Sequence, residues 1–503
     1  MTRVDRRGFL AGTTAAVLAG PAAVRPAAGQ ASSLPQGVWS QVQPWPTVAI
    51  HQTLLPNNKI LSWNYEGGGN NVGESSAFVV DVPPYADPST TWVEVRNTTT
   101  NLYCSGHAFL PDGRLLVVGG HNGDPYAGLS DVNIFDSSDG YRWHNPNTPM
   151  SGGRWYASAI TLPSGDVLVL SGSMTRKNDQ HPLPQVYMAA TGTWRNLTGA
   201  LAVMDNYPKI YVTPDGRVVS IGRERITTFL DTSGTGSWTQ GPTHLATANR
   251  AYGTSVNYEP GKYLVVGGAT AAGGVNTAEI LDLNDAAPAW QWANPMTYGR
   301  RHPNATLLPD GKVLVTGGTT SAGFNDAAGA IVAAEMWDPA TGLWSQMASA
   351  QTPRVYHSTA ILLPDMRVLV AGGGWPPAKN YGINNFNAEI FWPPYFGLGP
   401  APFIAWAPDV LAYGAGFPVI TPDAGNVQFV RLISHGSVTH SFNMNQRMQT
   451  LAFTRSSVDP QQLDVQMTAS ANLVPPGHYM LVLVNALGVP SRAWTVRVPV
   501  ASA

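Results

Sequence analysis

Six residues that can bind a metal or take part in redox chemistry recur at one position of a repeated phrase. The clearest copy of the phrase reads LPDGRLLVVGG, and the other copies keep its turn and its apolar run. The residue nine places before the turn is a thiol, a phenol or an imidazole in each of the last six copies: Cys104, Tyr156, Tyr207, Tyr252, His302 and His357. Imidazole nitrogens with phenolate oxygens suit Cu(II), whereas zinc usually recruits thiolates or carboxylates. The sequence therefore predicts a metal or redox centre if the fold brings these positions together.

The repeats have the length and the turn chemistry of kelch-type β-propeller blades. Their turn positions are Asn58, Gly113, Gly165, Gly216, Gly261, Gly311 and Met366, at intervals of 55, 52, 51, 45, 50 and 55 residues. A period of about 50 residues with a strand, a turn and a second strand that ends in Gly-Gly is typical of such blades. Equivalent positions of successive blades lie at equivalent heights around one axis, so we expect the six residues to converge at one end of the channel.

We predict an all-β chain with two domains. Residues 31–398 would form a seven-bladed kelch-type β-propeller. Its last blade lacks a fourth strand because Pro393-Pro394 ends the repeat, and GVWSQVQPWP at 37–46 copies the missing strand. Pairing the two ends would close the ring and remove exposed sheet edges. Residues 399–503 lack the phrase but alternate apolar and polar residues over short runs, which predicts an immunoglobulin-like β-sandwich.

Composition and the N-terminal segment bear on the partners of the protein and on where it acts. Charged residues make up 12% of the chain and the net charge is −2, so no basic surface points to nucleic acid. Arg6-Arg7 and the Ala-rich stretch that follows predict a twin-arginine export signal over residues 1–30, too short to span a membrane. The alternative is a disordered terminus with a chance arginine pair. We expect a secreted or periplasmic monomer without a membrane span. A lone cysteine there, Cys104, is either buried and inert or chemically used.

Four motifs resemble segments of the galactose oxidase and glyoxal oxidase family of copper radical oxidases. NLYCSG (101–106) resembles the family's segment with a crosslinked cysteine, and RWY (154–156) resembles the segment with the partner tyrosine. RVYHS (354–358) resembles the segment with the axial tyrosine and the first histidine ligand. GSVTH (436–440) is similar to the loop of the second histidine. The motifs occur in the family's order and span both predicted domains.

The resemblance implies a specific centre. One copper ion would be bound by Tyr156, Tyr356, His357 and His440, with a further position open to water or substrate. A thioether between Cys104 and the ring of Tyr156 would store a radical, and Tyr356 would act as the base that takes the substrate's hydroxyl proton. The implied reaction oxidises a small aldehyde, a primary alcohol or a sugar with O2 and releases H2O2.

Some positions stay open or depart from the family. Met174 stands where galactose oxidase stacks a tryptophan over its crosslink, so another aromatic such as Trp375 would have to take over. His302 either lines the substrate cavity or supports a ligand. Two of the tyrosines at the repeated position are expected to pack in the channel and not to bind the metal: Tyr207 and Tyr252. Four histidines are also expected not to be ligands: His51, His107, His121 and His435.

Three interpretations compete at this point. The leading one is the copper radical oxidase. The second is a kelch propeller that binds a carbohydrate or a protein without catalysis, in which Cys104 and the tyrosines are packing residues. The third is an enzyme with zinc or another non-radical site. One geometric test is available, because Tyr356 and His357 would face opposite ways on a regular strand. If both bind one metal, the backbone there must be irregular.

Overall fold

Strands and turns build almost all of the chain. The computed structural model describes residues 34–64, 73–82, 90–123, 126–222, 224–247, 250–374 and 384–501. Within these ranges there is no α-helix, and the three 3-10 helices are η1 (Ala327–Gly329), η2 (Pro394–Gly397) and η3 (Ala424–Asn426). No helix in the described residues has the length and hydropathy to cross a membrane. The predicted export segment, residues 1–30, lies outside the described residues. The predicted all-β fold is confirmed.

Each copy of the repeated phrase forms the two inner strands of an antiparallel sheet, and within the described ranges five of these seven sheets have four strands. In the second sheet, for example, β7 (Gly106–Phe109) and β8 (Leu115–Val118) are wholly buried. The turn between them places Gly113 at a φ of +94°, which glycine adopts without steric penalty. Met366, the residue at this position in the last copy, also has a positive φ of +71°. The second sheet is completed by β9 (Val132–Asp136) and β10 (Arg142–His144).

In the described residues, six more sheets follow the same order. The first three of them contain β3 (His51–Leu54), β4 (Ile60–Trp63), β5 (Ala77–Asp81) and β6 (Thr91–Glu94); β11 (Ser158–Thr161), β12 (Val167–Leu170), β13 (Gln185–Met188) and β14 (Thr193–Asn196); and β15 (Lys209–Val212), β16 (Val218–Ile221), β17 (Ile226–Asp231) and β18 (Ser237–Thr243). The next two contain β19 (Thr254–Glu259), β20 (Lys262–Val266), β23 (Ala278–Asp282) and β24 (Trp290–Ala293); and β25 (Asn304–Leu307), β26 (Val313–Thr316), β27 (Ala333–Asp338) and β28 (Leu343–Ser349). A short hairpin, β21 (Ala269–Thr270) and β22 (Gly273–Gly274), extends from the β20–β23 connection.

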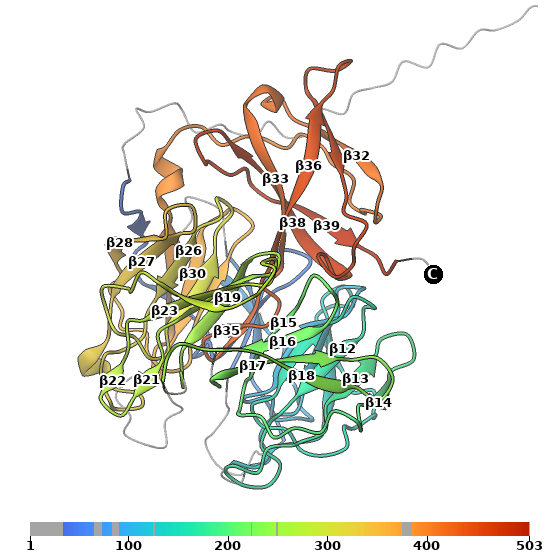
Figure 1. Cartoon of the computed structure of the whole chain (residues 1–503), viewed down its shortest axis with the longest axis vertical. Coiled ribbons are helices and arrows are strands. Elements are labelled where there is room, and N and C mark those ends of the chain that lie inside the picture. Colours follow the sequence, from blue (N-terminus) through green and yellow to red (C-terminus); the bar gives the residue numbers. More distant parts are fainter. Residues whose placement is uncertain are drawn as a thin grey trace, which may run out of the picture.

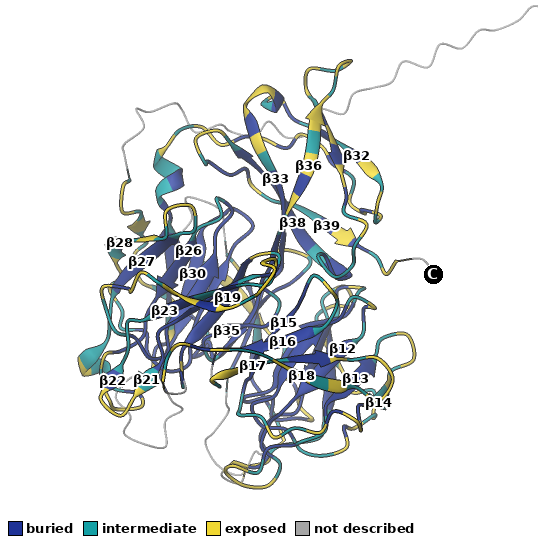
Figure 2. Cartoon of the chain, viewed as in Figure 1, coloured by how far each residue is buried: buried dark blue, intermediate teal, exposed yellow. Residues whose placement is uncertain are grey.

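The last propeller sheet joins the two ends of this part of the chain. It contains β29 (Ser358–Leu362), β30 (Val368–Gly372) and β31 (Asn387–Trp392), and its outer positions are taken by β1 (Val38–Trp39) and β2 (Gln43–Pro44). Val38 pairs with Trp392 and Gln43 with Ala388. From β7 through β11, β15, β19, β25 and β29 to β3, each innermost strand contacts that of the next sheet. Figure 2 shows these inner strands buried, while exposed residues gather on the outer strands and loops.

The C-terminal strands form a separate layer that sends one hairpin into the ring (Figure 1). The layer contains β32 (Gly416–Ile420), β33 (Val427–Ser434), β36 (Met448–Arg455), β37 (Gln462–Gln466), β38 (Gly477–Asn485) and β39 (Trp494–Val498). The first half of β36 pairs with β33 and its second half with β37, so that it connects two groups of strands around a common apolar core. The hairpin of β34 (Ser437–Thr439) and β35 (Phe442–Asn443) leaves this layer and pairs with the innermost propeller strand β3.

Candidate metal centre and substrate cleft

The six residues at the repeated position share one backbone conformation. Their φ angles are +57° at Cys104, +69° at Tyr156, +47° at Tyr207, +60° at Tyr252, +57° at His302 and +67° at His357. A non-glycine residue rarely adopts the left-handed region, and each instance stores strain that the surroundings must hold in place. Each of these residues stands one or two positions before an innermost strand. The left-handed residue turns the chain at the ring's end, and the side chain points to the centre.

Backbone hydrogen bonds join these residues from sheet to sheet. The N–H of Tyr156 donates to the carbonyl of Cys104 (2.8 Å), and the N–H of Tyr207 donates to the carbonyl of Tyr156 (2.8 Å). The N–H of His302 donates to the carbonyl of Tyr252 in the same way (2.8 Å). Each of these bonds joins the backbones of two residues at the repeated position. The bonds therefore fix the spacing between the side chains of those residues.

Buried arginines anchor the loops that lead into three of these positions. The Arg300 guanidinium donates to Glu335 (2.8 Å), and Arg354 donates to the carbonyls of Gly372 and Asn387 (2.9 Å each). The guanidinium of Arg154, which precedes Tyr156, binds the carbonyl of Ser171 (2.8 Å) and the side chain of Gln185 (3.1 Å). The repeated sequence thus supplies both the left-handed residue and its support.

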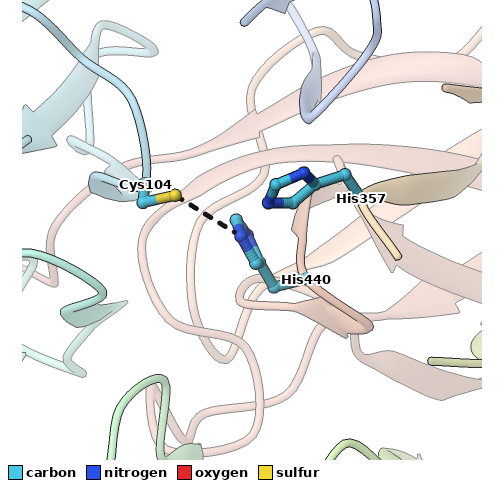
Figure 3. A group of neighbouring side chains, drawn as sticks. All are labelled: Cys104, His357 and His440. Carbon is cyan, nitrogen blue, oxygen red and sulfur yellow. Dashed lines mark hydrogen bonds between the residues drawn. The ribbon is translucent and has the colours of Figure 1, made fainter. Parts of the chain in front are cut away.

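Three potential metal ligands come together at the centre, as Figure 3 shows. The ligand atoms of Cys104, His357 and His440 all lie within 4.8 Å of one another. Cys104 Sγ lies 3.5 Å from His440 Nε2. His440 comes from the β34–β35 hairpin, so the C-terminal layer does reach the ring of propeller residues.

Two phenols complete the group. The hydroxyls of Tyr156 and Tyr356 are hydrogen bonded to each other. The Tyr356 ring stacks on His357 with centroids 3.7 Å apart, and the Tyr156 ring meets His440 edge-on at 4.8 Å. The backbone irregularity predicted at this dipeptide is confirmed, because the left-handed His357 lets consecutive side chains face the same centre.

Hydrogen bonds set the tautomer of both histidines. Thr439 Oγ1 donates to the carbonyl of Ile50 (2.9 Å), so it accepts from the Nδ1–H of His440 (2.6 Å). His357 Nδ1 donates to the carbonyl of Gly374 (2.8 Å) because a carbonyl can only accept. Each imidazole therefore carries its proton on Nδ1 and keeps the Nε2 lone pair for a ligand. Ligating histidines in metalloproteins are commonly oriented by such an outer partner.

The electrostatics of the group fit a bound cation. Burial lowers the pKa of His357 to about 3, so this imidazole is neutral, as a ligand must be. Burial raises the pKa of Tyr156 and of Tyr356 well above the ordinary value for a phenol. A metal ion reverses that effect and lets a buried phenol ionise. Two imidazoles and two phenols form a donor set that suits Cu(II). In the described residues, the His and Cys cluster adds the Cys104 thiol and contains no carboxylate.

The buried thiol of Cys104 is within hydrogen-bonding reach of Tyr156 and lies 3.5 Å from His440 Nε2. Burial raises the pKa of Cys104 well above its usual value, and hydrogen bonding to Tyr156, Tyr103 and Trp155 offsets part of that rise. The Trp155 ring also meets Tyr156 edge-on, with centroids 4.2 Å apart. Trp375, which was expected to cover this ring, lies outside the described residues.

A cleft of about 460 Å³ opens above the group. Its lining includes Tyr156, Tyr356 and His440, so the proposed ligands are reachable from it. His302 also lines the cleft, and its Nε2–H donates to the carbonyl of Phe324 (2.9 Å). The volume lies within the range of small-molecule sites, roughly 300–1,000 Å³.

Several cleft residues were not predicted from the sequence. Tyr252, expected to pack in the channel, is 38% exposed and lines the cleft. Tyr126, Phe324 and Lys209 line it as well. The loops of Tyr126 and Phe324 follow the Gly-Gly that ends a blade's second strand, which is the one signal that could have placed them at this end of the ring.

Comparisons with known proteins agree with this geometry. The chain matches the family model described as glyoxal oxidase N-terminus over residues 84–231 and 269–395, more than half of its length. It matches the model of the galactose oxidase-like early set domain over residues 401–498.

Individual relatives cover most of the chain. It is 27% identical to a galactose oxidase of Gibberella zeae over 92% of this chain and 70% of that protein. It is 27% identical to the aldehyde oxidase GLOX of Vitis pseudoreticulata over 82% of this chain and 85% of that protein. Among solved structures, a fungal alcohol oxidase in complex with copper aligns with a TM-score of 0.83 at 26% identity, covering 92% of this chain and all (100%) of that one. The chain therefore belongs to the glyoxal oxidase and galactose oxidase family and is an oxidase.

Proposed function

We propose that this oxidase binds one copper ion through Tyr156, Tyr356, His357 and His440 and oxidises a small aldehyde or primary alcohol with O2. The observation that carries the proposal is the convergence of two Nε2 atoms and two phenols beside a thiol at the base of a cleft. The copper in the similar alcohol oxidase supports the identity of the metal. Bound copper would supply a one-electron redox couple and a Lewis acid that lets the phenols ionise.

The second redox group would be a thioether between Cys104 and the ring of Tyr156. Its formation joins sulfur to a ring carbon and removes the thiol hydrogen and one ring hydrogen, with two electrons. O2 takes up these two electrons and two protons as H2O2. The hydrogen bond between the buried thiol and Tyr156, together with the backbone bond from the Tyr156 N–H to the Cys104 carbonyl, supports this bond. Loss of one further electron from the joined ring to O2 would leave a stored radical, flanked by the rings of Trp155 and Tyr207.

The protein groups at the base of the cleft would handle the proton of the substrate. Tyr356 lines the cleft and is hydrogen bonded to Tyr156, so its oxygen is placed to take the hydroxyl proton of a substrate. A primary alcohol then loses two electrons and two protons to become an aldehyde, and an aldehyde hydrate becomes an acid. O2 accepts the same two electrons and two protons as H2O2, which balances the turnover.

The cleft favours a small substrate with both apolar and polar parts. Tyr252 and Phe324 provide aromatic walls, and Lys209 and His302 provide polar side chains. Small aldehydes, primary alcohols and sugars all fit this description. We further propose that the chain is exported by the twin-arginine route through residues 1–30 and acts outside the cytoplasm as a monomer. The non-catalytic carbohydrate-binding or protein-binding propeller is the alternative, and family membership argues against it.

Oxygen consumption and peroxide release by copper-loaded protein test the proposal. Glyoxal, a primary alcohol and a sugar should be offered separately, and the active class should release one H2O2 per O2 consumed. Tyr356→Phe should lower turnover by roughly 10²–10⁴-fold, because it removes the proton acceptor and a ligand. Tyr211→Phe is the matched control, since that buried phenol binds Ser255 away from the cleft (2.9 Å). An inactive wild type with all three classes, or a fully active Tyr356→Phe, would contradict the proposal.

A further inference from the structure

The N–H of Cys104 departs from the hydrogen-bond pattern of its ring. At Tyr156 and Tyr207 the N–H donates to the carbonyl of the equivalent residue in the preceding sheet. The sheet before Cys104 is the first, and its abbreviated repeat places Ala49 at the equivalent position. The Ala49 carbonyl accepts instead from the hydroxyl of Thr359 (3.1 Å). The N–H of Cys104 donates to a side chain, His51 Nε2, at 3.1 Å.

That bond begins a chain of hydrogen bonds with one direction. Because His51 Nε2 accepts, its proton is on Nδ1, and Nδ1–H donates to His107 Nε2 (3.1 Å). His107 then carries its own proton on Nδ1 and donates it to the hydroxyl of Ser437. The Ser437 hydroxyl has two further partners within reach, the carbonyl of His107 (3.4 Å) and Thr53 Oγ1 (3.3 Å). Burial lowers the pKa of His107 to about 3, which keeps the ring in the neutral form that this chain requires.

The chain of bonds connects the two parts of the candidate centre. Cys104 stands at the entrance of β7, and Ser437 is the first residue of β34, three residues before His440. His51, His107 and Ser437 are all 0% exposed. The His51 ring stacks flat on Trp63, with centroids 4.7 Å apart and planes 1° apart, so the ring cannot turn without losing this contact.

We infer that His51 and His107 are positioning residues that hold Cys104 and the His440 hairpin in register for the copper centre. This inference rests on the proposed function. It adds two residues that do not bind the metal but fix the positions of residues at the centre. Cys104 has a left-handed φ of +57°, a strained conformation that persists only while its surroundings determine it. The His51 acceptor supplies the constraint that a carbonyl supplies at Tyr156, Tyr207 and His302. Without it, Cys104 relaxes and its sulfur moves away from the Tyr156 ring.

Substitution of His51 separates this role from simple packing. His51→Leu removes the acceptor, whereas His51→Gln keeps an acceptor and a donor on one side chain. In copper-free protein, hydrogen exchange of the Cys104 amide should rise about tenfold or more in His51→Leu and recover most of its protection in His51→Gln. When copper is added in air, the thioether should form about 10–100-fold more slowly in His51→Leu than in the wild type. The rate in His51→Gln should be much closer to that of the wild type.

His435→Leu is the matched control. His435 is also 0% exposed and also joins the hairpin region to β3, through the Leu54 carbonyl (3.2 Å), but it makes no bond in the His51–His107 chain. It should lower the melting temperature and leave both the Cys104 amide and the rate of thioether formation unchanged. Equal effects of His435→Leu and His51→Leu would overturn the inference, as would an unchanged Cys104 amide in His51→Leu.

The two readouts distinguish this inference from the proposed function. If wild-type protein forms no thioether with copper, the proposed function fails, while amide exchange in copper-free protein still tests the positioning role. If wild-type protein forms the thioether and His51→Leu forms it equally fast, the positioning role fails and the proposed function stands. His107→Leu should also raise exchange of the Cys104 amide and slow thioether formation, because it removes the acceptor of the His51 Nδ1–H.

Discussion

The propeller and the C-terminal layer contribute to the candidate centre in different ways. The propeller supplies Cys104, Tyr156 and His357 from one repeated, left-handed position, and neighbouring sheets share hydrogen bonds there. The C-terminal layer supplies His440 from a hairpin that, among the described strands, is the one that pairs with an innermost propeller strand from outside the propeller. The hairpin depends on β3 pairing and on side-chain bonds from Thr439 and Ser437. In the propeller, several equivalent hydrogen bonds hold the ligand-bearing positions, so that the loss of one leaves others in place. The position of the hairpin depends on a few individual contacts.

Even the repeated part is not uniform. Glu389 and Glu335 bind the arginines that precede the Tyr356–His357 pair and His302, but Arg154 meets an amide, Gln185, at the corresponding place. Burial lowers the pKa of Arg154 to about 9, and lowers that of Arg354 to about 10, where Glu389 opposes the shift. The loop of Tyr156 is therefore held by hydrogen bonds without a compensating charge.

The largest effect is expected for Cys104→Ser. The propeller frame should survive, because the hydroxyl is smaller than the thiol and the backbone bonds remain. Turnover should fall by roughly 10³-fold or more, since no thioether can form. Copper binding measured by calorimetry should change little, because sulfur is not among the proposed ligands. Unchanged peroxide release by this variant would remove Cys104 from the mechanism.

His440→Ala tests the hairpin side of the comparison. Loss of a ligand should weaken copper affinity by about 100-fold or more, beyond the 10–100-fold typical of outer partners. Titration of copper-free protein with Cu(II) measures this change. Lys209→Met provides a control in the cleft, because it alters a lining residue without removing a ligand. An affinity equal to that of the wild type would return the C-terminal layer to a purely structural role.

Thr439→Val tests the hydrogen bond that orients His440. The variant keeps the shape of the side chain but releases the Nδ1–H, so copper affinity should fall by about tenfold. Thr359→Val is the matched control, because its buried hydroxyl also bonds acceptors of the first repeat, the Gln52 side chain (2.9 Å) and the Ala49 carbonyl (3.1 Å). If both variants weaken copper equally, the effect comes from the fold and not from the tautomer.

Glu389→Gln makes one propeller anchor resemble the Arg154–Gln185 pair. Removing the carboxylate beside Arg354 should lower the free energy of unfolding by about 1–3 kcal/mol, since a buried guanidinium loses its charged partner. Denaturant titration measures the loss. Because the ring hydrogen bonds are redundant, copper affinity should stay within about threefold. A large loss of copper affinity would show that the frame is less redundant than the pairing pattern indicates.

The same contrast explains what could be predicted from the sequence. The repeated phrase located the positions of Cys104, Tyr156 and His357 because one geometry serves every copy. It did not identify the hairpin; the position of His440 came only from the resemblance of its loop. The direction of the His51–His107 bonds could not be predicted, because it depends on contacts between residues more than 50 positions apart. Tyr126 and Phe324 lie on connecting loops, whose paths no periodicity determines.

Mass measurement of the joined peptides tests the central claim most directly. Copper-free protein should be alkylated and digested, and a second sample should first receive copper in air. The account predicts that the peptides of Cys104 and Tyr156 then appear as one species, lighter by two hydrogen atoms than their sum, with no alkylated Cys104. Full alkylation of Cys104 after copper treatment, with both peptides separate, would contradict it.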